Sequence, residues 1–171
     1  MTAPRVIERT WVAPAKKERK RIMQMVRLIY VSRMTEECDI LAIQQILDVA
    51  RKKNQALGIT GVLCYDPTFF LQCLEGSRTA VNELYADIQQ DGRHRDVVLL
   101  EYCDAEQRLF ADWSMAFLKT QDASREVLEK YTGGRKFDPY CLTSGQARDL
   151  LVELVATAHD RLSKQRADLR D

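Results

Sequence analysis

The apolar residues of this 171-residue chain repeat with two different periods, and the order of those periods restricts the fold. Alternating or continuous apolar runs predict strands at 26–32, 60–65, 69–75, 96–102 and 108–118. Apolar residues three and four apart predict one helix that begins after Asp39, fades near Lys53 and stops before Gly58, and a second that begins after Ser77 and ends near Asp91. This order predicts an α+β fold, with a ferredoxin-like five-stranded sheet and two helices on one face.

The residues beyond the predicted sheet offer a cover for its other face. Residues 124–131 favour a short helix, and Thr143 with Gln146 forms a capping-box pattern before a long amphipathic helix. We expect these C-terminal helices to pack on the bare face of the sheet or against another subunit. The chain is therefore expected to divide into a flexible N-terminal tail at 1–24, a domain at 25–119 and a C-terminal helical extension at 120–171.

The composition is ordinary for a globular protein, with 46% hydrophobic and 30% charged residues. The net charge of +1 does not favour nucleic acid as a partner, and no apolar run is long enough to predict a membrane span. A basic cluster at 16–21 is not followed by an apolar stretch, which argues against a secretory signal. The five cysteines include no CxxC pair, which disfavours disulfides and metal sites and favours a cytoplasmic location.

Three polar side chains stand where the predicted strands or their approaches should be apolar. Tyr30 lies inside the first strand, Gln72 lies inside the third, and Asn54 shortly precedes the second. A buried polar group without a partner costs roughly 1–3 kcal/mol, so we expect these groups to face a common planar, polar ligand. Each residue taken alone also has an ordinary interpretation, as a strand tyrosine, an exposed strand glutamine or a helix C-cap.

The sequence lacks the motifs of the common catalytic sites. No GxSxG, HExxH, Walker A or GxGxxG pattern occurs, and His94 has no nucleophile motif to serve. Gly58 and Gly61 of the GITG run precede a strand rather than open a helix, which argues against a phosphate loop. We therefore predict that the protein is not an enzyme. An RNA-binding sheet is a further alternative, but the aromatic and glycine pattern of such sheets is missing.

Five short motifs occur in an order and spacing that resemble those of the BLUF domain, the blue-light sensor that uses FAD. They are LIYVS at 28–32, NQALGITG at 54–61, FLQCLEG at 70–76, DGRH at 91–94 and WSM at 113–115. The resemblance extends over about 25–119, and the C-terminal helices resemble those of short BLUF proteins that lack an attached enzyme. It implies a ferredoxin-like sheet that holds FAD non-covalently between its two helices.

The resemblance also implies roles for individual residues. The Tyr30 phenol is implied to lie near the flavin, with Gln72 bridging its hydroxyl and the N5/O4 edge of the ring. Asn54 is implied to hydrogen-bond the carbonyl side of the ring. Trp113 and Met115 match a pair on the fifth strand that responds to rearrangement of the glutamine.

The remaining implied contacts surround the ring or its tail. Arg93 and His94 match the DxRH turn and are implied to hold the ribityl or phosphate end of the cofactor. Ile46 and Ile88 are implied to form apolar walls. Ala50 stands where some relatives carry a polar residue, so we expect one contact on the pyrimidine side to be absent.

These assignments predict a blue-light photoreceptor. Light is expected to move an electron and a proton from Tyr30 to the flavin, and their return leaves Gln72 rearranged and the absorption shifted to the red. The change is expected to reach the C-terminal helices and to alter homo-oligomer formation or docking to a separate output protein. Two alternatives stay open, a ferredoxin-like interaction or ligand-binding module that does not sense light, and a flavin enzyme such as a reductase.

Overall fold

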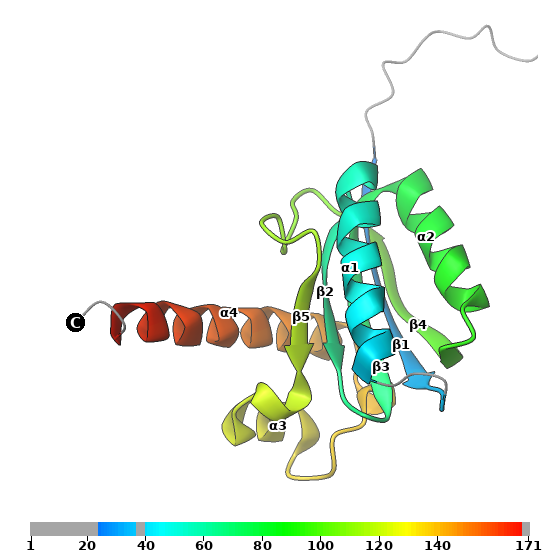
Figure 1. The fold of residues 1–171 in the computed structure, drawn as a ribbon. Coiled ribbons are helices and arrows are strands. Elements are labelled where there is room, and N and C mark those ends of the chain that lie inside the picture. The colour runs from blue at the N-terminus through cyan, green and yellow to red at the C-terminus, as the bar shows by residue number, and fades with distance from the viewer. Residues whose placement is uncertain (1–23, 37–39, 169–171) are drawn as a thin grey trace, which may run out of the picture.

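The computed structural model describes the backbone of residues 24–36 and 40–168 and, within these ranges, the side chains outside 40–46 and 162–168. The predicted tail, apart from Gln24, and the predicted cap at Asp39 lie outside the described residues. Strands and helices alternate first, and a run of helices follows (Figure 1). The elements are β1 (Met25–Met34), α1 (Ile40–Leu57), β2 (Thr60–Tyr65), β3 (Phe69–Ser77), α2 (Arg78–Gln90), β4 (His94–Asp104), β5 (Ala116–Lys119), η1 (Thr120–Asp122), α3 (Arg125–Thr132), η2 (Pro139–Cys141) and α4 (Ser144–Asp168).

The five strands form one mixed sheet in the order β4-β1-β3-β2-β5. β1 pairs antiparallel with β3 and β4, and β2 pairs antiparallel with β3 but parallel with β5. α1 and α2 lie on one face of the sheet, and α4 crosses the other (Figure 1). This arrangement confirms the predicted α+β fold with two helices on one face. Because α4 covers the face that an RNA-binding sheet leaves open, the structure does not support that alternative.

Each face of the sheet has its own hydrophobic core, because successive side chains of a strand point to opposite sides. Leu28 and Tyr30 of β1 belong to the core beneath α1 and α2. Ile29 and Val31 belong to a second core that includes four residues of α4. Of the two positions expected for the long C-terminal helix, the structure therefore shows packing on the sheet. In the described part of the chain, no helix is both long and apolar enough to cross a membrane.

Local hydrogen bonds begin the helices where the sequence predicts. The Ser77 hydroxyl accepts from the Ala80 amide at 3.3 Å, and Ser124 caps α3 in the same way. At the start of α4, the Thr143 hydroxyl accepts from the Gln146 amide at 3.3 Å, and Gln146 Oε1 accepts from the Thr143 amide at 3.0 Å. This reciprocal pair is the predicted capping box.

α1 continues past Lys53, near which the sequence predicts fading, and ends at Leu57, before Gly58 as the sequence predicts. Gly58 ends the helix with φ of +64°, and two backbone bonds close the turn, from the Gly58 amide to the Gln55 carbonyl at 3.3 Å and from the Ile59 amide to the Asn54 carbonyl at 2.8 Å. These bonds are those of a Schellman motif. Asn54 therefore lies in the last turn of α1, and its interpretation as a C-cap is wrong.

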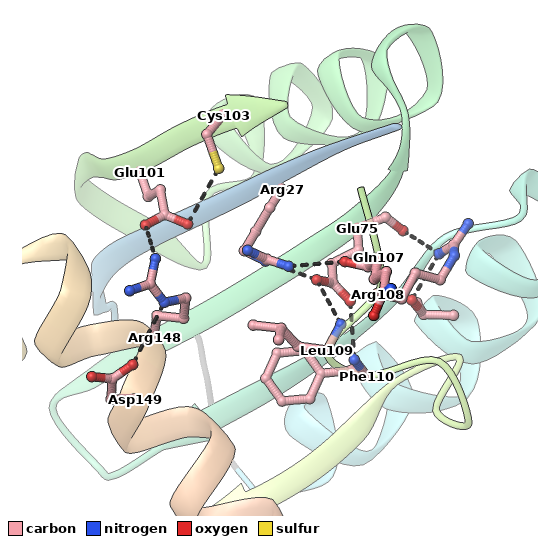
Figure 2. A network of polar contacts seen from close by, with 11 residues as sticks. Arg27, Glu75, Glu101, Cys103, Gln107, Arg108, Leu109, Phe110, Arg148 and Asp149 are labelled. Carbon is pink, nitrogen blue, oxygen red and sulfur yellow. Dashed lines mark hydrogen bonds and ion pairs between the residues drawn. The ribbon is translucent and has the colours of Figure 1, made fainter. Parts of the chain in front are cut away.

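The fifth strand is shorter than predicted. The sequence pattern indicated a strand over 108–118, but β5 contains only Ala116–Lys119. The reason is a side chain far away in the sequence, because the amides of Leu109 and Phe110 both donate to the carboxylate of Glu75, each at 3.0 Å (Figure 2). Backbone donors that bind a side chain are not available to a strand ladder.

Gly61→Ala is expected to destabilise the protein. A Cβ atom at position 61 would lie 2.1 Å from the backbone oxygen of Cys73 on the neighbouring strand, and only separation of β2 from β3 relieves that overlap. We expect urea denaturation to show a loss of about 2 kcal/mol or more in the free energy of unfolding.

Gly145→Ala is the matched control for this substitution. Its Cβ would lie 3.9 Å from the nearest atom, a guanidinium nitrogen of Arg148. We expect this variant to gain stability, by about 1 kcal/mol at most. Equally small effects at the two glycines would contradict the steric argument.

Candidate functional site

Tyr30 and Gln72 face each other across the pairing of β1 and β3. They are register partners, so their side chains leave the same face of the sheet. The Tyr30 hydroxyl donates to Gln72 Oε1 at 2.5 Å, and the two residues are 0% and 6% exposed. Burial, with smaller contributions from Tyr85 and Asp91, raises the pKa of the Tyr30 phenol well above its ordinary value. The phenol therefore keeps its proton at neutral pH and acts as a hydrogen-bond donor.

Met115 contacts the other end of the same carboxamide. Gln72 Nε2 donates to Met115 Sδ at 3.4 Å, and Met115 lies immediately before β5 with 3% of its surface exposed. The acceptor end of the Gln72 amide thus faces the Tyr30 phenol, and its donor end faces a thioether. Because an amide carries both kinds of group, a half-turn of its plane exchanges the two.

A cavity of about 280 Å³ lies beside this chain of contacts and between α1 and α2. Ala50 of α1, Leu84 of α2 and Phe70 of β3 line it, so it extends from the helix pair to the sheet. Three other hollows of about 410–470 Å³, formed by described residues elsewhere, contain none of the predicted site residues. Seven of those predicted residues line the cavity between the helices, namely Tyr30, Asn54, Gln72, Ile88, Arg93, His94 and Met115.

Asn54 connects the cavity wall to the residues before β5. Its Nδ2 donates to the Ser114 carbonyl at 3.0 Å, and only 1% of the residue is exposed. Among the residues that the structure describes, its Oδ1 finds no hydrogen-bond partner. A buried acceptor without a partner costs roughly 1–3 kcal/mol. A ligand that donates a hydrogen bond to this oxygen removes that cost.

His94 forms a polar but uncharged part of the same wall. Its Nδ1 lies 2.7 Å from the Ser32 hydroxyl, and its ring centroid lies 4.7 Å from that of Phe70. Burial lowers the pKa of the imidazole to about 4, although the charge of Asp91 opposes the shift. The ring is therefore neutral at pH 7. Within the described ranges, no three His, Cys, Asp or Glu side chains gather to hold a metal ion.

Charged side chains also line the cavity. Arg93 Nε donates to both carboxylate oxygens of Asp91, at 2.8 and 3.1 Å, and this hydrogen bonding lowers the pKa of Asp91. Lys53 of α1 and Asp87 of α2 form an ion pair at 2.5 Å. Both of these side chains are largely exposed, so their pair contributes less than about 1 kcal/mol and does not seal the cavity.

The two residues predicted for the fifth strand do not share a face. Met115 belongs to the core beneath α1 and α2, whereas Trp113 packs against the core beneath α4. The predicted alternation fails because residues 108–115 are not a strand. Ile46 lies in α1, but its side chain is outside the described residues.

Residues 25–116 match the protein family described as "BLUF: Sensors of blue-light using FAD". This match includes more than half of the chain. The chain belongs to the BLUF family. Its fold is similar to the solved structure "BlsA photo-activated state", with a TM-score of 0.68 and 32% identity, covering 76% of this chain and 94% of that chain. It is also similar to "BlrB - a BLUF protein, dark state structure", with a TM-score of 0.66 and 29% identity, covering 79% and 97%.

Similarity to larger BLUF-containing proteins is confined to a small part of them. "Photoactivated adenylate cyclase subunit beta" of Euglena longa is 30% identical over 125 residues, which are 67% of this chain but 14% of that protein. BlsA and BlrB, by contrast, are matched over nearly their whole length. The comparisons therefore agree with the prediction of a BLUF sensor, and the part of this chain that matches the cyclase subunit spans only 14% of that protein.

The FAD that BLUF domains bind non-covalently suits the groups that line the cavity. The unpartnered Asn54 oxygen accepts a hydrogen bond, and the Gln72 amide offers both donors and an acceptor, as the edge of a flavin ring requires. Leu84 and Ile88 supply apolar wall, and Arg93, which is paired with Asp91, supplies a polar part of the lining. Ala50 also lines the cavity.

Two residues that contact His94 in this BLUF site are not among the site residues predicted from the sequence. Ser32 binds His94, and Phe70 packs against the same imidazole. Both share a face with the predicted pair, because Ser32 follows Tyr30 by two residues and Phe70 precedes Gln72 by two. The strand period therefore contained the signal that identifies them.

Acid is expected to destabilise the protein through His94. The imidazole has a pKa of about 4 when folded and about 6.5 when unfolded, so only the unfolded chain gains this proton over that range. The destabilisation is absent above pH 6.5, grows as the pH falls toward 4 and is complete below it. We expect His94→Gln to lose less stability than the wild type between pH 7 and pH 5, measured by urea denaturation.

The exposed His159 provides the control for this prediction. His159→Gln should lose as much stability as the wild type between the same two pH values. If His94→Gln and the wild type lost equal stability, the assignment of this pH dependence to His94 would be wrong.

Proposed function

We propose that this BLUF protein is a blue-light photoreceptor that signals by rearranging the hydrogen bonds of Tyr30 and Gln72. The observation that carries the proposal is the buried chain of contacts from the Tyr30 hydroxyl through Gln72 to Met115, in the wall of a cavity that suits a flavin. No step needs a general base or a nucleophile, and this fits the lack of catalytic motifs.

The cofactor and the phenol divide the first step between them. FAD, when bound, supplies the absorption of blue light and accepts an electron from a nearby donor. Tyr30 is a buried, protonated phenol whose proton is directed at Gln72 Oε1. Loss of an electron makes a phenol far more acidic, so electron release and proton release are linked at this residue. The 2.5 Å hydrogen bond gives the proton a path toward the amide.

The amide of Gln72 supplies the switch. In the dark arrangement its oxygen accepts from Tyr30 and its nitrogen donates to Met115. In the rearranged state the nitrogen faces the phenol and the oxygen faces Met115 Sδ. A thioether has no proton to donate, so that second contact is lost. Rearrangement of Gln72 therefore releases Met115 without any net chemical change.

Met115 gives the change a route to the far face of the sheet. It directly precedes β5, and Ala116 of β5 belongs to the core that also contains Leu150 and Leu151 of α4. We propose that α3 and α4 then alter self-association or docking to a separate output protein. A cytoplasmic location is part of this proposal, and the free thiols of Cys64 and Cys73 fit a reducing compartment.

Gln72→Leu is expected to abolish the light response while FAD stays bound. Leucine keeps the approximate volume of glutamine but offers neither a donor nor an acceptor. After reconstitution with FAD, we expect wild-type protein to show a small, reversible red shift under blue light and the variant to show none. Absorption spectra recorded before and after illumination measure this. Gln90→Leu, on the exposed side of α2, is the control and should keep the shift.

The outcomes of the same experiment separate the alternatives. A red shift in Gln72→Leu would contradict the proposed switch. Wild-type protein that stays colourless after FAD reconstitution would favour the interaction module. A yellow protein that NAD(P)H readily bleaches would favour a reductase.

Illumination is expected to change the self-association of the protein. Size-exclusion chromatography in the dark and under continuous blue light should give different elution volumes for the wild type and identical volumes for Gln72→Leu. An elution volume of the wild type that does not respond to light would contradict the self-association route and would leave a separate partner as the receiver.

A further inference from the structure

Two polar pairs occupy opposite faces of the β1–β3 pair. Tyr30 and Gln72 are register partners that face α1 and α2, and Arg27 and Glu75 are register partners three residues away along each strand. Because three is an odd number of residues, the second pair points to the other face, toward α4. Figure 2 shows Glu75 between Arg27 and the backbone that follows β4. The sensor site does not include this second pair.

Residues 107–115 connect β4 to β5, and we call them the connecting segment. Glu75 is 0% exposed and holds one end of this segment. Its Oε1 accepts from Arg27 Nε at 2.8 Å and from the Leu109 amide at 3.0 Å, and its Oε2 accepts from the Phe110 amide at 3.0 Å. Arg27 also donates to the Gln107 carbonyl at 3.1 Å. The buried charge is thus paired and hydrogen-bonded by groups that all belong to β1 or to this end of the segment.

Arg108 fixes the same end of the connecting segment to β2 and to the end of α1. Its Nη1 donates to the Thr60 hydroxyl at 2.7 Å and to the Glu75 carbonyl at 2.6 Å, and its Nη2 donates to the Gly58 carbonyl at 2.7 Å. Charge-assisted hydrogen bonds of this kind are stronger than bonds between neutral groups.

The other end of the connecting segment is held less firmly. Three backbone carbonyls there each accept one hydrogen bond, and no buried charge takes part. Ala111 and Asp112, which lie between the two ends, are exposed. The three bonds run from the Gly61 amide to Trp113 at 3.0 Å, from Asn54 Nδ2 to Ser114 at 3.0 Å and from Arg51 Nε to Met115 at 3.4 Å.

We propose that Glu75 is a positioning residue of the photoresponse, an inference that rests on the proposed function. By fixing one end of the connecting segment, Glu75 keeps Met115 Sδ within reach of Gln72. Glu75 also makes a displacement of Met115 pass along the chain into β5, because the backbone on the N-terminal side of Met115 is fixed. Glu75 does not line the flavin cavity, so its influence on Gln72 passes through the connecting segment.

The test compares Glu75→Gln with the wild type. The side chain keeps its size, but one oxygen becomes an NH₂ group that must face an N–H donor of Arg27 or Phe110. We expect the dark spectrum and the red shift to be unchanged. Return from the lit to the dark spectrum should be at least threefold faster, because Met115 is buried beside the Gln72 amide even after their hydrogen bond is lost, and a loosened Met115 resists the rotation of that amide less.

A second readout does not depend on light. Hydrogen–deuterium exchange of the peptide covering residues 107–119 should be faster in Glu75→Gln than in the wild type, with and without FAD. Glu101→Gln is the matched control, because Glu101 also binds an arginine on this face, Arg148 of α4 at 3.3 Å, without a bond to the connecting segment. Its return rate should stay within about twofold, which is the scatter expected of an uncoupled site.

The route through Met115 is tested by combining substitutions. Met115→Ala should also return faster than the wild type, and the double variant with Glu75→Gln should return no more than about twofold faster than Met115→Ala alone. Multiplicative effects of the two substitutions would overturn the inference. So would a Glu75→Gln protein that returns at the wild-type rate or more slowly, even if it unfolds at a lower temperature.

The remaining outcomes of these experiments separate a failure of this inference from a failure of the proposed function. If Glu75→Gln does not fold, Arg108→Met loosens the same end and keeps the Arg27–Glu75 pair, and it carries the same expected results. Wild-type protein without a red shift would overturn the proposed function and this inference together. A normal red shift with an unchanged return rate in the variants would overturn this inference alone.

Discussion

Helices cover both faces of the sheet, and this determines how the buried polar groups on β1 and β3 find hydrogen-bond partners. α1 and α2 close one face and α4 closes the other, so the buried side chains on these strands cannot bind bulk water. They bind one another, as Tyr30 binds Gln72 and Arg27 binds Glu75. Among the cavity-lining residues that the structure describes, Asn54 carries the buried oxygen without a partner, and this marks the wall where a bound ring is held.

The two polar pairs differ in the energy needed to change them. The bond between the Tyr30 phenol and the Gln72 amide joins neutral groups, and such a bond contributes about 0.5–1.5 kcal/mol net. Breaking a buried ion pair such as Arg27–Glu75 costs about 3–5 kcal/mol, because a buried charge is left without compensation. The same two strands therefore carry a contact that rearranges easily and, three residues away, a contact that stays fixed. A local change at Gln72 can then occur without loosening the sheet.

The sequence predicts the features that depend on neighbouring residues. The strand period places Tyr30 and Gln72 on one face, and the Ser77 and Thr143 caps follow from residues within one turn of each helix. The extent of β5 does not follow, because apolar residues from Ala111 to Phe117 alternate as in a strand. What prevents that strand is Glu75, which lies more than thirty residues earlier and binds two backbone amides.

The same separation in sequence, between Glu75 and the backbone that it binds, explains why the predicted common face of Trp113 and Met115 is wrong. Alternation assigns both to one face, but the turn that begins at Phe110 sends them to different cores. The period does contain a signal for Glu75, because it shares a strand face with Leu71 and Cys73, where a carboxylate needs a partner. The strand period does not identify the backbone amides that bind Glu75, because a backbone amide has no sequence signature.

The position of α4 suits it to receive a displacement of β5. Phe110, at the fixed end of the connecting segment, and Ala116, at the start of β5, belong to the same core as Leu150 and Leu151 of α4. A shift of β5 relative to Phe110 must therefore be accommodated beneath the helix, since a close-packed interior transmits strain rather than absorbing it. α4 has 25 residues, or about 37 Å of length, and its C-terminal part extends beyond β5 (Figure 1). A small tilt of α4 where it packs on the sheet becomes a larger movement at its C-terminal end. In the proposed function, that end is where a binding partner would respond most strongly.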